Sequence, residues 1–114
     1  MSEPIEMEEN ALISVAMQII LNAGDSRIKI TEALEKAKQF DFENASKAME
    51  EAEKAITLAH KSQTEIIQNE ASGNTYQFSL LFAHAQDTLM TIQSELRMAK
   101  EMISILKLIE EKMK

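Results

Sequence analysis

Four side chains that could carry out chemistry lie close together past the middle of the chain, in a segment without Gly or Pro. They are His84, Asp87, Thr88 and Thr91. The surrounding pattern predicts a helix, and steps of three and four residues place all four on one side of it. A neutral imidazole has a lone pair on one ring nitrogen, so His84 can act as a nucleophile. Alternatively, Asp87 fixes the ring of a core histidine, because an isolated His-x-x-Asp spacing is a weak signal.

The composition favours helix over the whole chain. Of 114 residues, two are Gly and one is Pro, and 45% are hydrophobic, whereas only 4% are aromatic. Few residues are therefore available to end helices or form tight turns, and the length fits a single domain, residues 1–114. The absence of Cys excludes a disulfide, a thiolate metal site and a cysteine nucleophile.

The net charge and the apolar runs indicate where the protein works. A formal net charge of −7 argues against nucleic acid and anionic membrane surfaces as partners. The N-terminus is acidic and shows no secretory leader. The longest apolar run, near Ala11–Ala23, is interrupted by polar residues and is too short to cross a bilayer. We therefore expect a soluble, cytoplasmic protein.

Three helices are expected to position the site. Residues 1–7 are predicted to form a flexible tail, and a first helix runs from about Glu8 to about Gln39. Asp41 is a candidate N-cap of the second helix, and Ala71–Thr75 is the turn before a third helix that continues to the C-terminus. The expected fold class is all-α, an antiparallel three-helix bundle.

Small residues mark two places along these helices. Gly24 lies near the centre of the first helix, where it indicates a kink or the close approach of another backbone. The second helix has alanines at steps of three and four residues, at Ala45, Ala48, Ala52, Ala55 and Ala59. This seam predicts that a neighbouring helix packs unusually close.

The third helix has two apolar stripes. The first contains Phe78, Leu81, Ala85, Leu89, Ile92, Leu96, Ala99, Ile103 and Leu106. The second contains Leu80, His84, Asp87, Thr91, Ser94, Met98, Met102, Ile105 and Ile109. A three-helix bundle needs only one apolar face per helix, so the second stripe predicts a further partner, for which copies of the same chain are the simplest candidate. A wider face within one chain is the alternative.

The segment from His84 to Thr91, His-Ala-Gln-Asp-Thr-Leu-Met-Thr, resembles the active-site helix of the IIA component of the lactose/cellobiose family of the sugar phosphotransferase system. That family typically shows His-x-Gln-Asp-His-Leu-Met-Thr, and six of its seven fixed positions match here. Further similar segments follow the family's order, at Asn22–Arg27, Ala59–Thr64 and Glu70–Gly73. The resemblance favours a bend at the glycine of the first helix.

The resemblance implies a phosphoryl carrier that forms a homotrimer. His84 would accept a phosphoryl group from phospho-HPr, as a tele-phosphohistidine, and pass it to a cysteine of the IIB component. The sugar would be phosphorylated later by the membrane complex that contains IIC. Gln86, Thr88 and His60 are supporting residues near the site. Asp87 from each chain would meet on the threefold axis around Mg²⁺ or another divalent cation, since Mg²⁺ prefers oxygen ligands.

Thr88 departs from the family pattern, which usually has a second His at this position. A threonine hydroxyl can donate one hydrogen bond but cannot act as a cation, so the departure affects the support of His84 rather than the acceptor itself. Ala85 favours a β-linked disaccharide of the cellobiose/chitobiose branch over lactose, since lactose-type members often have Gly there.

Two other classes of protein remain as alternatives. A histidine phosphotransfer domain of signalling systems is also a helical bundle with one reactive His, but it usually carries Lys and Gly shortly after that His, where this chain has Gln86-Asp87-Thr88. A non-catalytic helical interaction module would explain the heptads and the acidity. It would not explain His84 and Asp87 among apolar residues. A kinase is disfavoured because the chain has no glycine-rich phosphate loop.

Overall fold

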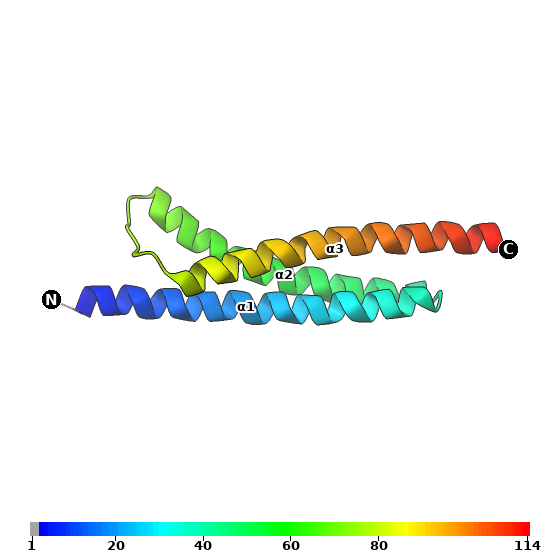
Figure 1. Ribbon diagram of the computed structural model, residues 1–114, viewed down its shortest axis with the longest axis horizontal. Helices are drawn as coiled ribbons and strands as arrows, with labels where there is room; N and C mark the ends of the chain where they lie inside the picture. Colours follow the sequence, from blue (N-terminus) through cyan, green and yellow to red (C-terminus); the bar gives the residue numbers. More distant parts are fainter. Residues whose placement is uncertain (1–2) are drawn as a thin grey trace.

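Three long helices make up the computed structural model, which describes the backbone of residues 3–114 and the side chains of residues 11–114. They are α1 (Glu3–Lys38), α2 (Phe42–Ala71) and α3 (Leu80–Met113). Figure 1 shows α1 and α2 as an antiparallel hairpin and α3 lying along α1 in the same direction. The bundle measures 70 × 20 × 18 Å, and the predicted all-α, antiparallel three-helix architecture is confirmed.

The start of α1 differs from the prediction. The helix begins at Glu3 rather than near Glu8, so most of the predicted tail is helical. Pro4 lies in the first turn, where a backbone N–H has no partner within the helix and its absence costs little. Met1 and Ser2, which the prediction also placed in the tail, lie outside the described residues.

The bend predicted at Gly24 is absent. Figure 1 shows α1 continuing straight through this position as a single helix. A Cβ added to Gly24 would meet no atom of the chain within 4 Å, so no backbone packs closely against the glycine. Gly24 is therefore tolerated inside a helix whose buried stripe on either side fixes its path.

The turn between α1 and α2 is built without glycine. The amide of Asp41 donates to the carbonyl of Lys36 at 2.9 Å, and the amide of Phe40 donates to that of Ala37 at 2.9 Å. This is a Schellman motif, and its left-handed residue is Phe40, with φ of 60°. The Asp41 side chain then accepts a hydrogen bond from the amide of Asn44, which confirms the predicted N-cap of α2.

The alanine seam of α2 packs against α1. Ala45, Ala48, Ala52 and Ala59 are buried, and Ala55 is half-buried. Ser26 of α1 is fully buried, and its hydroxyl donates to the backbone carbonyl of Ala52 at 2.8 Å. A hydroxyl that reaches the facing backbone requires close helices, as the small residues predicted.

The first predicted stripe of α3 supplies its share of the core. Six of its residues are buried, namely Ala85, Leu89, Ile92, Leu96, Ala99 and Ile103. Phe78, which was also assigned to this stripe, is 85% exposed because it precedes the helix. Ser79 is the N-cap of α3, and its side chain accepts from the amide of Phe82. The described residues contain no helix long and apolar enough to cross a membrane.

Candidate functional site

The Arg27–Glu95 ion pair shows the register of α1 against α3. The guanidinium donates two hydrogen bonds to the carboxylate, at 2.9 and 2.7 Å, so the pair is bidentate. The hydrogen bond from Arg27 lowers the pKa of Glu95. The same bond raises the pKa of the Arg27 guanidinium. The pair therefore marks which residues of α1 and α3 lie at the same level, whereas the buried core between the helices holds them there.

This register places His84 beside the first half of α1. Ala16 lies eleven residues before Arg27, and His84 lies eleven residues before Glu95. Because α1 and α3 run in the same direction, Ala16 and His84 lie at the same level (Figure 1). Eleven residues are about three helical turns, so His84 projects from nearly the same side of α3 as Glu95, towards α1. Met17, next to Ala16, is 43% exposed and offers an apolar surface at this level.

The His84 side chain is exposed. It lies in the second turn of α3, just after the helix start that Ser79 caps. The alternative of a buried core histidine, held by Asp87, is therefore wrong. In the described chain, Asp87 is exposed as well, and no hydrogen bond joins the two side chains. An exposed imidazole on a rigid helix is accessible to a large partner.

The Thr88 hydroxyl bonds to the backbone of its own helix. It donates to the carbonyl of His84 at 2.8 Å, one turn earlier. Because a hydroxyl has only one proton, Thr88 in this rotamer has no proton to donate to a group on the His84 ring. The family's second histidine is thus replaced by a side chain that is directed to the backbone.

Gln86 and His60 lie away from His84. Gln86 is half-buried and lines a small hollow with Leu12, Tyr76 and Phe82, on another side of α3. His60 lies on the exposed surface of α2, where its Nδ1 pairs with the Thr64 hydroxyl at 3.3 Å. The described chain brings neither side chain into hydrogen-bonding contact with His84.

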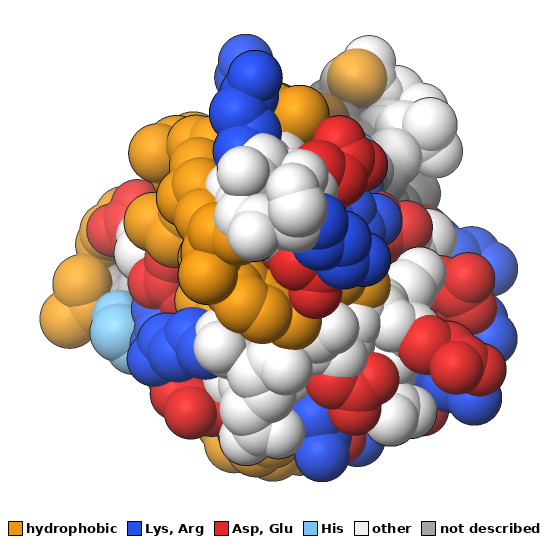
Figure 2. Space-filling model, turned by 90° about the vertical axis from the view of Figure 1, so that its right-hand side faces the viewer, with side chains coloured by type: hydrophobic (Ala, Val, Ile, Leu, Met, Phe, Trp, Pro, Cys, Tyr) orange, Lys and Arg blue, Asp and Glu red, His pale blue; other side chains and the backbone are white. Residues whose placement is uncertain are grey.

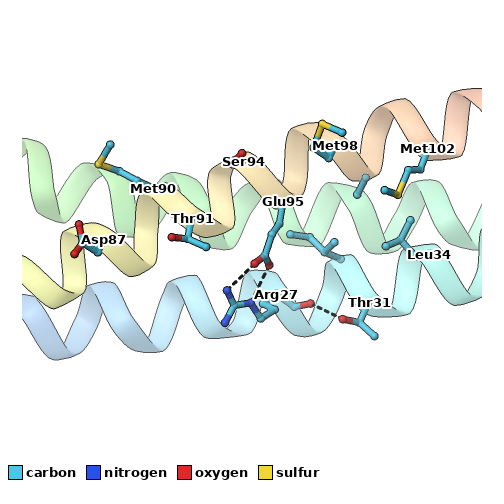
Figure 3. Close-up of a pocket in the computed structure, with 12 residues that line it drawn as sticks. Arg27, Thr31, Leu34, Asp87, Met90, Thr91, Ser94, Glu95, Met98 and Met102 are labelled. Atoms are coloured by element: carbon cyan, nitrogen blue, oxygen red, sulfur yellow. Dashed lines mark hydrogen bonds and ion pairs between the residues drawn. The ribbon is translucent and has the colours of Figure 1, made fainter.

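Asp87 lies at one end of an open groove between α1 and α3. Figure 3 shows Asp87, Thr91 and Met98 following one another along α3, with Leu34 on the α1 wall. The remaining lining residues include Arg27, Thr31, Met90, Ser94, Glu95 and Met102. The groove therefore contains much of the second predicted stripe, and the described part of the chain leaves that stripe uncovered.

Sequence reasoning missed three features of this surface. The first is Ser26, which the sequence analysis includes only within the segment Asn22–Arg27. The second is the ion pair between Arg27 and Glu95, which no pattern in a single sequence predicts. The third is a set of exposed apolar residues on the outer face of α1, Ile13, Met17, Leu21 and Ile28. Their spacing of four, four and seven residues is helical, and this second period on α1 could have been found.

The expected metal ion has no complete set of ligands within residues 11–114 of one chain. Within residues 11–114, no group of three or more His, Asp or Glu side chains could bind one. Asp87 contributes one carboxylate, and the oxygens of Thr91 and Ser94 lie further along the same side of the helix (Figure 3). A hard cation needs several oxygen ligands, so a site at Asp87 requires symmetry-related copies of the chain.

Comparison with known proteins identifies the family. Residues 14–107 match the family model described as PTS system, lactose/cellobiose-specific IIA subunit. The chain is 41% identical, over 93% of its length and 92% of the relative's, to the lichenan-specific phosphotransferase enzyme IIA component of Bacillus subtilis. The all-helical bundle, together with the family match over residues 14–107, places the chain among the proteins of the sugar phosphotransferase system. The chain is a member of the lactose/cellobiose IIA family of that system.

Solved structures agree with this assignment. The crystal structure of the cellobiose-specific enzyme IIA from Bacillus anthracis superposes with a TM-score of 0.83 at 42% identity, covering 87% of this chain and 91% of that one. The IIA(chitobiose) protein of Escherichia coli, solved in complex with HPr, gives a TM-score of 0.76 at 33% identity, covering 87% of this chain and 96% of that one. The fold and the family predicted from the sequence are confirmed.

Proposed function

We propose that this chain is a phosphoryl carrier that accepts its phosphoryl group from phospho-HPr on His84 and passes it to the cysteine of a IIB component. The observation that carries the proposal is the exposed imidazole of His84 at the motif position, on a rigid helix of a IIA-family bundle. Such a position makes the imidazole accessible to two different partners in turn.

The transfer exchanges one nitrogen–phosphorus bond for another. The Nε2 lone pair of His84 attacks the phosphorus held on the donor's histidine, the donor N–P bond breaks, and its electron pair returns to the donor imidazole. The product is a tele-phosphohistidine. In the next step the thiolate of IIB attacks, and the His84–phosphorus bond breaks in the same way. These steps need positioning and charge stabilisation more than covalent machinery.

The supporting groups come from more than one subunit in this proposal. Gln86 points away from His84 in its own chain, so its amide can reach phosphoryl oxygens only on a neighbouring copy. The Thr88 hydroxyl donates to the carbonyl of His84, one turn back along the same helix, and lies beside the ring as a small neutral side chain. His60 takes no direct part in its own chain, because it lies on α2, where its ring pairs with the Thr64 hydroxyl one turn further along the same helix.

The carrier is proposed to work as a homotrimer joined along the apolar second half of the second stripe of α3, while the polar first half, which contains His84, stays accessible to the partners. That stripe is exposed in one chain, with Leu80 at 76%, Met98 at 55% and Ile105 at 54%. Three Asp87 carboxylates would then converge on the threefold axis, where their repulsion favours a shared divalent cation such as Mg²⁺. The cation would hold the subunits together and would not take part in phosphoryl transfer.

The partners and the sugar follow from the relatives. The IIA(chitobiose) neighbour was solved bound to HPr, which supports HPr as the donor here. The proposed sugar is a β-linked disaccharide, with cellobiose or chitobiose favoured over lactose by Ala85; the relatives include proteins named for cellobiose, lichenan, chitobiose and lactose. In this proposal the chain acts in the cytoplasm and meets the membrane only through the IIC transporter.

Incubation with radiolabelled phospho-HPr, followed by mapping of the modified residue, tests the assignment. The label is expected on His84. His84→Ala should abolish uptake while the helical content and the thermal transition stay unchanged, since the side chain is exposed. His60→Ala is the matched control, an exposed histidine on another helix, and should accept phosphate normally. Label on the His84 variant, or on His60, would disprove the assignment.

A further inference from the structure

Basic side chains are distributed unevenly along the bundle. All twelve Lys and Arg of the chain lie in residues 27–61 and 97–114, so residues 1–26 and 62–96 contain none. His84 and Ala16, which lie at the same level, both belong to the stretches without Lys or Arg. Figure 2 views the opposite end of the molecule, where Lys and Arg side chains are spread around the surface. The proposed phosphoryl acceptor therefore lies away from most of the basic side chains.

The nearest basic side chains of α1 and α3 are too far along the bundle to contact a group on His84. Arg27 lies about 16 Å beyond the level of His84, and its guanidinium donates two hydrogen bonds to Glu95 (Figure 3). Arg97 follows His84 by about 20 Å along α3. Salt screens exposed charges over a length of about 8 Å at physiological ionic strength. Neither guanidinium can therefore compensate a charge at His84.

Lys61 of α2 lies near the level of His84 but on another side of the bundle. Ala52 marks the side of α2 that faces α1, because its carbonyl accepts the hydrogen bond from the buried Ser26 hydroxyl. Lys61 is about two and a half turns further, so it projects from the opposite side of α2, and it is exposed. His84 lies about 160° round α3 from Lys100, which pairs with a glutamate of α2. The Lys61 and His84 side chains therefore project away from each other.

The charged side chain that follows His84 most closely along α3 is an acid. Asp87 lies three residues later, on the same side of the helix, and is exposed. Thr88 is neutral, and its hydroxyl proton is donated to the carbonyl of His84. A phosphoryl group carries up to about two negative charges at neutral pH. On His84 it would lie beside a carboxylate, and within residues 11–114 of the same chain no Lys or Arg is placed to offset its charge.

Neighbouring copies do not supply the missing charge in the proposed trimer. Because the Asp87 carboxylates meet on the axis, the copies lie at the same level, and their α1 and α3 residues at this level again come from 1–26 and 80–96, which contain no Lys or Arg. One divalent cation on the axis would be outweighed by three carboxylates. Within the carrier, the position beside His84 that could hold a cation is the one that Thr88 occupies, where the family usually has histidine.

We propose that Thr88 raises the phosphoryl-transfer potential of His84, which is the tendency of the phosphorylated chain to give up its phosphoryl group. The inference rests on the proposed function and adds how strongly the carrier holds the group. A histidine at this position can add a cation one turn from the acceptor, whereas a threonine cannot. Because the charge of the phosphoryl group is not compensated, exchange with phospho-HPr is shifted towards the donor. Onward transfer to IIB is favoured to the same extent.

Equilibrium exchange between radiolabelled phospho-HPr and the full-length chain, in EDTA at low salt, measures this potential. One N–P bond forms and another breaks, so the amounts of the phosphorylated and free forms of both proteins give the equilibrium constant. Thr88→Arg adds a permanent cation one turn from His84. It should shift the constant towards the phosphorylated chain by about tenfold relative to the neutral Thr88→Gln. Leu80→Arg, one turn before His84 at a position that is 76% exposed, should shift it in the same direction relative to Leu80→Gln.

Thr57→Arg is the matched control. Thr57 is also an exposed helical threonine whose hydroxyl donates to the carbonyl four residues earlier, at 2.8 Å, but it lies on α2. The variant adds the same charge to the chain and should leave the constant within about twofold of the unmodified value. The shifts caused by Thr88→Arg and Leu80→Arg should shrink in about 1 M NaCl, because salt screens exposed charges.

Equal equilibrium constants for Thr88→Arg, Leu80→Arg and Thr57→Arg would overturn the proposal, and so would shifts that persist unchanged in high salt. An equilibrium constant does not depend on how fast the two proteins dock, so a variant that only slows docking cannot imitate the expected result. Label on His84 with equal constants would refute only this inference. Absence of label from the unmodified chain and from every variant would refute the carrier function itself.

Discussion

In the proposed function, Thr88 lies one turn after the phosphoryl acceptor His84, where the resembled family usually has a second histidine. Its hydroxyl is bonded to the carbonyl of His84, so it contributes no charge and no free donor in the observed rotamer. A small neutral side chain one turn from the acceptor neither blocks the ring nor stabilises the bound phosphoryl group as a cation would.

We therefore expect Thr88→His to change the rate of phosphate uptake without being required for it. The added imidazole can bind phosphoryl oxygens when protonated, which favours faster uptake. If it stabilises the transition state by about 1.4 kcal/mol, the rate of uptake rises about tenfold. Rapid-quench measurement with labelled phospho-HPr compares the two proteins. A natural chain that is inert, with activity only in the histidine variant, would contradict the expectation and show that this copy has lost its function.

Glu95 makes a pH-dependent contribution to stability. Its pKa is lowered in the folded state by the hydrogen bond from Arg27, so its contribution is fully present above the unfolded-state pKa and is lost as pH falls through the folded-state pKa. Both side chains are about half exposed, at 49% and 40%, which limits the effect to at most about 1 kcal/mol.

Glu95→Gln should therefore lower the free energy of unfolding slightly at neutral pH and lose this difference in acid, below the lowered pKa of Glu95. Urea unfolding across the acid range measures the difference. Lys38→Gln removes a charge from a more exposed pair with Glu35 and should have a smaller effect. A difference between Glu95→Gln and the unmodified chain that persists unchanged in acid would show that the ion pair is not its source.

The elements are held together by small residues as much as by large ones. The α1–α2 contact depends on the alanine seam, because the buried Ser26 hydroxyl reaches the carbonyl of Ala52 only if the two helices pack closely. A larger side chain at the seam must push the helices apart or adopt a strained rotamer.

Ala52→Leu should lower the free energy of unfolding by about 1–3 kcal/mol or more, since its methyl is fully buried against α1. Ala71→Leu, at the exposed end of the same helix, is the control and should stay within about 0.5 kcal/mol. Chemical denaturation of both variants gives the comparison. An Ala52 variant as stable as the control would mean that the seam is more open than the structure shows.

At the scale of the whole molecule, the uncovered stripe of α3 makes assembly the main question. A monomer would expose Met98, Met102, Ile105 and Ile109 together, whereas burial in a trimer is favourable by about 25 cal/mol per Å² of apolar surface. The Asp87 carboxylates oppose this association unless a cation or a proton offsets their charge.

Asp87→Leu should therefore give a trimer that is more stable than the unmodified one in EDTA and does not respond to Mg²⁺. The unmodified trimer should gain stability with Mg²⁺ and lose it on chelation. Light scattering against concentration, with and without EDTA, measures both. A monomer at micromolar concentration that ignores divalent cations would refute the second stripe as an interface and the cation at Asp87 together.

The three helices, most of the core and the family could be predicted from the amino-acid sequence. The 3.6-residue period of apolar positions and the lack of glycine and proline leave few alternatives to a helical bundle, and the alanine steps of α2 predicted its packed face. The segment around His84 identified the IIA family because it combines rare residue types in a fixed order. These properties depend on residues that are close together in the sequence, so they can be predicted without the three-dimensional structure.

Which groups face one another depends on how the helices pack in three dimensions. The pair Arg27–Glu95 joins residues 68 positions apart, and it shows the level at which His84 lies beside α1. The path of α1 through Gly24 follows from packing on both sides of it, which outweighs the cost of one glycine. The exposure of His84 depends on where neighbouring helices end, and a helical period cannot specify that.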